Sequence, residues 1–164
     1  MTNLTEVVPA SEPVETGVRD VVPVACGLSE ALADTYRLVF KTHACHWNVQ
    51  GPLFYPIHQL TEAQYTEMFA AADVIAERIR ALGQLAPARL CDVIKASAIE
   101  DPNKQPSAQA MIEDLAADHA KVAARLHALI TLADAHDDPV SADLMTARAA
   151  FHETAAWMLR ATAK

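Results

Sequence analysis

The chain has 164 residues, the size of one ordinary domain, and 52% of them are hydrophobic while only 5% are aromatic. The formal net charge of −8 gives no basic surface for nucleic acid, and no apolar run approaches the roughly 18 residues of a membrane span. The many alanines and few glycines favour helices packed on helices over a β-sandwich. Three widely spaced cysteines, and no basic start followed by an apolar core, predict a cytoplasmic protein.

Residues 1–27 contain three prolines and two glycines and show no helical periodicity. They carry four acidic residues against one arginine, Arg19, and they contain no lysine. We therefore predict a flexible acidic N-terminal tail over residues 1–27 and a helical domain over residues 28–164.

Four long segments, interrupted by proline or glycine only at their ends, make up most of the remaining chain. Ser29 and Ser107 are suitable N-caps, and Gly83 suits the position just after a helix. We predict long helices over residues 29–50, 56–82, 107–136 and 140–163, with a short helix over residues 88–98 between the second and third.

Four helices of similar length predict an all-α protein with a ferritin-like four-helix bundle. The loop over residues 51–55 is short, so the first two long helices should be antiparallel neighbours. The connection over residues 83–106 is long enough to cross the bundle. Other all-α packings remain open from helix lengths alone.

The second long helix carries a histidine and three carboxylates along one face. At about 100° per residue, these side chains fall within a stripe of about 100°. His58 and Glu62 form one pair and Asp73 and Glu77 form another, but the two pairs are about 22 Å apart along the helix axis. Ligands bond to a metal at about 2.0–2.2 Å, so a straight helix cannot bring both pairs to one ion.

Two arrangements could complete each half of such a metal site. A Glu-x-x-His motif on another helix, as in di-iron bundles, is absent from the sequence. A two-fold dimer, with this helix packed antiparallel on its copy near residues 67–68, would bring the first pair of one chain to the second pair of the other. His46, twelve residues before His58, could fold back toward it through the turn at Gly51 and Pro52.

These side chains form a mixed nitrogen and oxygen ligand set. Such a set suits Fe(II), Mn or Zn, and it lacks the thiolates that Cu(I) and iron–sulfur clusters prefer. The alternative is that the carboxylates form an exposed, solvated edge of the helix. The spacing alone does not decide between the two interpretations.

The segments HWNVQG and DVIAERIRALG, with His58 between them, resemble the Dps family of mini-ferritins. DDPVSADL and AAWMLR resemble the last helix of the same family. The resemblance implies a bacterial, cytoplasmic protein whose subunit is a four-helix bundle and whose shell contains twelve subunits. It also implies that the shell oxidises Fe(II), preferably with hydrogen peroxide, stores ferric mineral and so protects DNA from oxidative damage.

The resemblance assigns roles to individual residues as well. It implies a ferroxidase site that holds two irons and is shared between two subunits. Glu62 stands where the family often has aspartate, and its longer side chain could shift the second iron. The implied catalytic residues, which are also the metal ligands, are His46, His58 and Glu62 from one subunit and Asp73 and Glu77 from its neighbour.

Other residues near these motifs receive weaker assignments. Trp47 matches a tryptophan that lies beside the site and intercepts radicals, although core packing explains it equally well. Asp143 is a candidate for an acidic pore that admits Fe(II), and His43 is a candidate for a site on that route, against plain structural or solvated roles. Cys45 is expected to be a buried bystander, and the remaining histidines are expected to be scattered and structural.

The alternative function is DNA binding and compaction, with iron oxidation secondary. Members of the family that bind DNA generally use a flexible tail rich in lysine and arginine. Because the tail of this chain is acidic, we do not expect direct DNA binding. The expected partners are further copies of the chain, Fe(II) and hydrogen peroxide, with no membrane.

Overall fold

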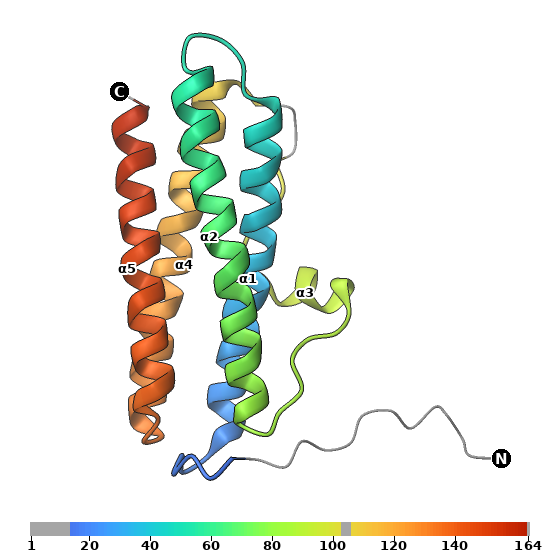
Figure 1. Ribbon diagram of the computed structural model, residues 1–164, viewed down its shortest axis with the longest axis vertical. Coiled ribbons are helices and arrows are strands. Elements are labelled where there is room, and N and C mark those ends of the chain that lie inside the picture. The colour runs from blue at the N-terminus through green and yellow to red at the C-terminus, as the bar shows by residue number, and fades with distance from the viewer. Residues whose placement is uncertain (1–13, 103–105, 164) are drawn as a thin grey trace, which may run out of the picture.

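The computed structural model describes residues 14–102 and 106–163, and in that part of the chain it contains five helices and no strand. The long helices lie side by side, and the short helix lies beside them (Figure 1). The helices are α1 (Val21–Asn48), α2 (Phe54–Ala81), α3 (Leu90–Ala96), α4 (Ala108–Ala135) and α5 (Pro139–Thr162).

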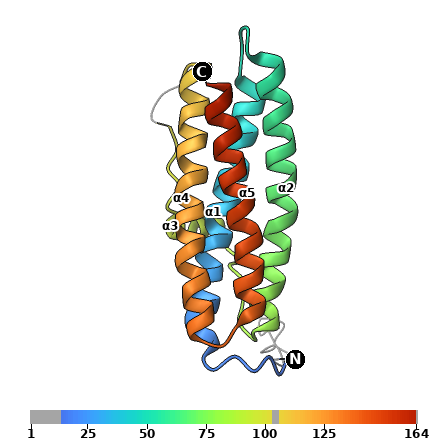
Figure 2. The same cartoon turned by 90° about the vertical axis from the view of Figure 1, so that its left-hand side faces the viewer.

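The long helices form two antiparallel pairs, α1 with α2 and α4 with α5, and the pairs meet mainly through α1 and α4. The connection after α2 runs back along the bundle to the start of α4, and α3 lies within it against α1 (Figure 1 and Figure 2). The predicted four-helix bundle, with a short extra helix in a crossover connection, is therefore confirmed.

Two of the predicted helix ends are also confirmed. Ser107 caps α4, because its hydroxyl accepts a hydrogen bond from the backbone N–H of Ala110. Gly83 follows α2 with φ of 79°, and its N–H donates to the carbonyl of Arg80. This left-handed position satisfies carbonyls that the end of a helix leaves free.

The predicted start of the first helix at residue 29 is wrong. The helix α1 begins at Val21, and its N-cap is Asp20, whose carboxylate accepts a hydrogen bond from the N–H of Val22. Ser29 lies inside the helix, where its hydroxyl donates to the carbonyl of Ala25. The predicted tail over residues 1–27 is therefore too long, while residues 1–13 lie outside the described part of the chain.

Proline and glycine misled the sequence interpretation for two physical reasons. Pro23 occupies the first turn of α1, where a backbone N–H would have no partner within the helix. Gly27 marks a close approach of α1 to α4, because a Cβ atom at this position would lie 2.5 Å from Cδ1 of Leu129. Both residues therefore belong to the helix and do not terminate it.

The core consists of aliphatic side chains from all five helices, with many alanines among them. Small side chains allow the helices to pack closely, and the larger ones fill the space between them. No helix in the described ranges is long and apolar enough to cross a membrane. Polar side chains are also buried inside the bundle, and two of them are histidines, His119 and His152.

Candidate metal centre

The end of α1 and the start of α2 hold the imidazoles of His46 and His58 against each other. The ring centroids are 3.7 Å apart and the rings are tilted by only 15°. Nδ1 of His46 lies 2.9 Å from the carbonyl oxygen of His58, and Nδ1 of His58 lies 2.9 Å from the carbonyl oxygen of His46. The predicted return of His46 to His58 through the turn is confirmed.

These two hydrogen bonds fix the tautomer of both rings. A carbonyl oxygen can only accept, so each Nδ1 carries the proton and donates it. Each neutral imidazole then has its lone pair on Nε2, which is the atom that can bind a metal. A histidine whose second nitrogen donates to a backbone carbonyl is the usual arrangement around protein-bound metals.

Aromatic side chains surround the two imidazoles. Phe54 stacks on the ring of His58 with the centroids 5.0 Å apart, and Tyr65 presents its edge to His46 at 5.3 Å. His43 lies between Tyr65 and Trp47, with centroid distances of 4.2 Å and 4.0 Å. Trp47 is 57% exposed, so packing in the core of its own subunit does not explain this residue.

The three predicted carboxylate ligands, Glu62, Asp73 and Glu77, are all exposed on α2. In one chain they do not join the histidines, since the described residues contain no group of three or more His, Cys, Asp and Glu that could hold a metal ion. The structure thus brings together His46 and His58 only. Because α2 is one continuous helix, Asp73 remains about 22 Å from His58 along its axis.

Cys45 is adjacent to His46 in the sequence but does not share its environment. The side chain is 5% exposed, and burial raises the pKa of the thiol to about 11. It therefore remains a neutral thiol at physiological pH. The expectation that Cys45 is buried is confirmed.

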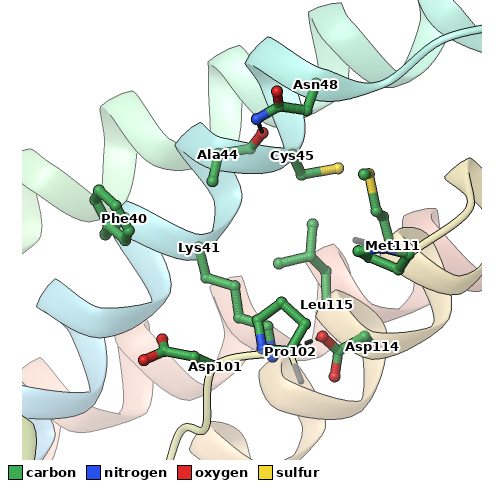
Figure 3. A pocket seen from close by; sticks show the side chains of 11 residues that line it. Phe40, Lys41, Ala44, Cys45, Asn48, Asp101, Pro102, Met111, Asp114 and Leu115 are labelled. Carbon is green, nitrogen blue, oxygen red and sulfur yellow. Dashed lines mark hydrogen bonds and ion pairs between the residues drawn. The ribbon is translucent and has the colours of Figure 1, made fainter. Parts of the chain in front are cut away.

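Cys45 lines a surface cavity of about 370 Å³ between α1, α4 and the chain around Pro102. Figure 3 shows the sulfur atoms of Cys45 and Met111 pointing toward each other, and the end of the Lys41 side chain passing behind the Pro102 ring. The Lys41 ammonium lies 2.7 Å from the carboxylate of Asp114. None of the five predicted metal ligands lines this cavity.

The acidic residues near the turn between α4 and α5 have different surroundings. Asp138 is fully buried, caps α5 and accepts a hydrogen bond of 2.6 Å from Arg78. Asp137 is exposed and pairs with Arg19 at 2.8 Å. Asp143, the candidate pore residue, is exposed on α5.

The expectation that the remaining histidines are scattered is wrong for two of them. His119 of α4 and His152 of α5 meet in the bundle interior with their Nδ1 atoms 2.9 Å apart. Burial, together with the charge of Arg148, lowers the pKa of His119 to about 3. Burial, together with the neighbouring His119 and the charge of Arg148, lowers the pKa of His152 to about 2. Their separation of 33 residues gave no sequence signal for this contact.

Known proteins share both the fold and the sequence pattern. The ferritin-like domain family matches residues 25–164. DNA protection during starvation protein 2 of Bacillus anthracis is 34% identical over 134 residues, which cover 82% of this chain and 92% of that protein. The DNA protection during starvation protein of Brevibacillus brevis is 31% identical over 148 residues, which cover 90% of this chain and 98% of that protein.

Solved structures give the same result. A Dps protein from Bacillus brevis superposes with a TM-score of 0.83 at 32% identity, covering 86% of this chain and 95% of that one. Antigen TpF1 from Treponema pallidum superposes with a TM-score of 0.85 at 28% identity, covering 92% and 99%.

The matching domain and the bundle define a ferritin-like protein. Within that class the chain belongs to the Dps family, because its similarity to the DNA protection during starvation proteins of two bacteria covers 82% and 90% of the chain. The resemblance expressed by the HWNVQG and DVIAERIRALG segments is therefore confirmed at the level of the family.

Proposed function

We propose that this protein oxidises Fe(II) at a site shared between two subunits and stores the ferric product inside a shell of twelve copies. Hydrogen peroxide is the preferred oxidant. The ligands are His46, His58 and Glu62 of one subunit and Asp73 and Glu77 of its neighbour, and each site binds two irons. Removing Fe(II) and peroxide together protects DNA from oxidative damage.

The reciprocal hydrogen bonds of His46 and His58 are the observation that carries this proposal. They leave two Nε2 lone pairs at one place on the subunit, held by a rigid contact between α1 and α2. Nitrogen ligands of this kind suit Fe(II), and carboxylates suit the ferric charge that develops during oxidation. Within the described part of one chain, no carboxylates join the two histidines to form a metal site. Under this proposal the neighbouring subunit supplies Asp73 and Glu77.

The exposed surface of α2 supports a two-fold contact that would supply them. Phe69 is 60% exposed and lies on α2 between the two halves of the predicted site. Val74 is 49% exposed and lies beside the second half. Large apolar side chains in such positions favour burial against a partner. An antiparallel contact centred near residues 67–68 would place Asp73 and Glu77 of one copy opposite His58 of the other.

Two irons held side by side allow a two-electron reaction. Each Fe(II) gives up one electron, the O–O bond of hydrogen peroxide breaks, and two protons complete two water molecules. A single Fe(II) can transfer only one electron and would leave a hydroxyl radical. The paired site therefore consumes peroxide without releasing that radical.

Mixed assembly of two inactive variants tests whether the site is shared. His58→Ala and Asp73→Ala subunits are unfolded, mixed and reassembled, and their co-assembly is measured by native mass spectrometry. In a mixed dimer, one site keeps every ligand while the other lacks both groups, so iron oxidation should partly return. If co-assembled shells show no recovery, the site is not shared in the way proposed.

The relatives named for DNA protection raise the alternative that this chain binds DNA directly. The net charge of −8 opposes contact with a polyanion, and residues 1–27 contain no lysine. We therefore propose that any protection of DNA acts through iron and peroxide chemistry, without a stable complex with DNA.

A further inference from the structure

The interior of the subunit contains a layer of polar side chains that the proposed iron chemistry does not use. His119 and His152 are 0% and 1% exposed, and Gln64 of α2 is 4% exposed. Burying a polar group costs free energy unless it is hydrogen-bonded, so three such side chains in one bundle require an explanation.

The position of this layer along the bundle can be given relative to the ion pair between Arg148 of α5 and Glu67 of α2. Both nitrogens at the end of the guanidinium contact the Glu67 carboxylate. Gln64 lies three residues before Glu67 on α2, and His152 lies four residues after Arg148 on α5. Because α2 and α5 run in opposite directions, both residues lie one turn from the ion pair toward the same end of the bundle (Figure 1).

The layer has hydrogen-bonding capacity that the chain itself does not satisfy. Within the described ranges, both polar atoms of the Gln64 amide and Nε2 of His119 are buried without a hydrogen-bond partner. The remaining imidazole contact, between the two Nδ1 atoms of His119 and His152, uses one donor and one acceptor. Gln64 thus offers a donor and an acceptor, and His119 offers one further group.

The surrounding charge decides what kind of ligand this layer can hold. Arg148 lies close enough to depress the pKa of both imidazoles, so a divalent cation beside them would meet the same repulsion. The carboxylate of Glu67 is already engaged by that guanidinium. An anion is also disfavoured, because the Glu67 carboxylate already neutralises the Arg148 guanidinium, whose buried Nε–H has no partner and adds one donor to the layer. A small neutral molecule that both donates and accepts hydrogen bonds fits the remaining groups.

We propose that the layer of Gln64, His119 and His152 is an internal binding site for ordered water, which bridges α2 to α4 and α5. Buried waters typically make about three hydrogen bonds to polar groups that lack other partners. The site matters for the fold because α2 and α5 approach each other closely at few points, and these include the Glu67–Arg148 pair and the hydrogen bonds of Arg78 to Asp138 and Ser141.

A crystal structure of the assembled protein, at a resolution that shows water, tests the identity of the ligand. Crystals are grown after treatment with EDTA, and a second set is soaked in CoCl₂ and measured at the cobalt edge. We expect water within hydrogen-bonding distance of Nε2 of His119 and of the Gln64 amide, with no anomalous peak in the layer. A cobalt peak there, or a direct Gln64–His119 hydrogen bond without water, would overturn the proposal.

Thermal unfolding of variants tests whether the layer links the helices. Gln64→Met removes the amide at nearly constant volume, His119→Phe removes the unpartnered nitrogen, and the double variant removes both. If water bridges the two, each single change lowers the melting temperature, and the double change lowers it by less than the sum. Strictly additive losses would contradict a bridge. Gln50→Met, the same change at an exposed position in the turn after α1, is the matched control and should leave the melting temperature unchanged.

Discussion

His46 and His58 orient each other, because Nδ1 of each ring donates to the backbone carbonyl of the other residue at 2.9 Å. Each histidine is thus both a candidate ligand and the support of its neighbour. Losing either ring removes one nitrogen ligand and the stacked contact that the other ring makes with it, while the backbone carbonyl that accepts from the remaining ring is kept. The effects of substituting the two residues should therefore be strongly non-additive.

We predict that His58→Ala weakens anaerobic Fe(II) binding by about 10–100-fold, because it removes one nitrogen ligand together with the stacked contact of His46. The double variant His46→Ala, His58→Ala should be little worse than either single variant. Isothermal titration calorimetry under anaerobic conditions measures the affinities. His127→Ala, an exposed histidine paired with Glu153, is the control and should bind Fe(II) normally. Independent, additive losses would show that the two rings do not support each other.

The buried histidines make the subunit sensitive to acid. The folded pKa values of His119 and His152, about 3 and about 2, lie below the ordinary value of 6.5. The unfolded chain therefore binds more protons below pH 6.5, and stability falls as the pH drops from there toward the folded values. Above pH 6.5 the two histidines add no pH dependence.

Each histidine should cost about 1.4 kcal/mol of stability per pH unit below 6.5, or about 2 kcal/mol at pH 5. Urea unfolding at pH 7 and pH 5, at one protein concentration, measures the change. The double variant, with both His119→Leu and His152→Leu, should lose less unfolding free energy than the wild type between these two pH values, by up to about 4 kcal/mol. An identical loss in both proteins would mean that the pair is not neutral in the folded state.

The buried ion pair of Arg78 with Asp138 should stabilise the junction between α2 and α5. Asp138 is fully buried, caps α5 and accepts from the Ser141 hydroxyl at 2.6 Å as well as from Arg78. Asp138→Ala would leave the guanidinium without its partner, so we expect a loss of about 3–5 kcal/mol in chemical unfolding. Asp137→Asn breaks only the exposed pair with Arg19, and this matched control should cost about 1 kcal/mol or less.

The sequence predicted the parts of the fold and site that depend on spacing within one helix. The stripe of His58, Glu62, Asp73 and Glu77 could be recognised because all four residues belong to α2. The return of His46 could be predicted because only a short turn separates α1 from α2. In both cases the geometry of a single helix or a single turn contains the information.

Features that depend on packing between distant segments could not be predicted in this way. Gly27 reads as a helix breaker until α4 is placed against it, where Leu129 occupies the space of a side chain. The contact of His119 with His152 likewise requires the register of α4 against α5. Neither the packing of α1 against α4 nor the register of α4 against α5 follows from the periodicity of one helix alone.

We predict that the protein forms no salt-resistant complex with DNA. Each subunit carries a net charge of −8, so association would rely on bridging cations and would weaken as monovalent salt increases. An electrophoretic mobility shift assay at physiological salt, with EDTA present, measures this. Adding Mg²⁺ at low salt is the comparison in which retention of DNA should increase. A stable complex under the first condition would contradict the prediction.

Iron oxidation should consume about one hydrogen peroxide per two Fe(II), because each proposed site would hold two irons that give up one electron each. Glu77→Gln should slow the reaction markedly, since it removes a negative ligand where ferric charge develops. The proposed shell should persist, because the two-fold contact is expected to be held by apolar side chains such as Phe69 and the exposed Glu77 contributes nothing to the core of the subunit. Stopped-flow absorbance, peroxide consumption and size-exclusion chromatography measure the three quantities.

Glu113→Gln, an exposed change of the same kind on α4, is the control for Glu77→Gln and should keep the wild-type rate. The assembled protein without iron should gain stability from Glu77→Gln, because the carboxylates that two subunits bring to the proposed site repel each other when no metal is bound. A Glu77→Gln protein with normal rate and stoichiometry would show that Glu77 is a solvated helix charge. The second half of the proposed site would then have to be sought elsewhere on the surface of α2.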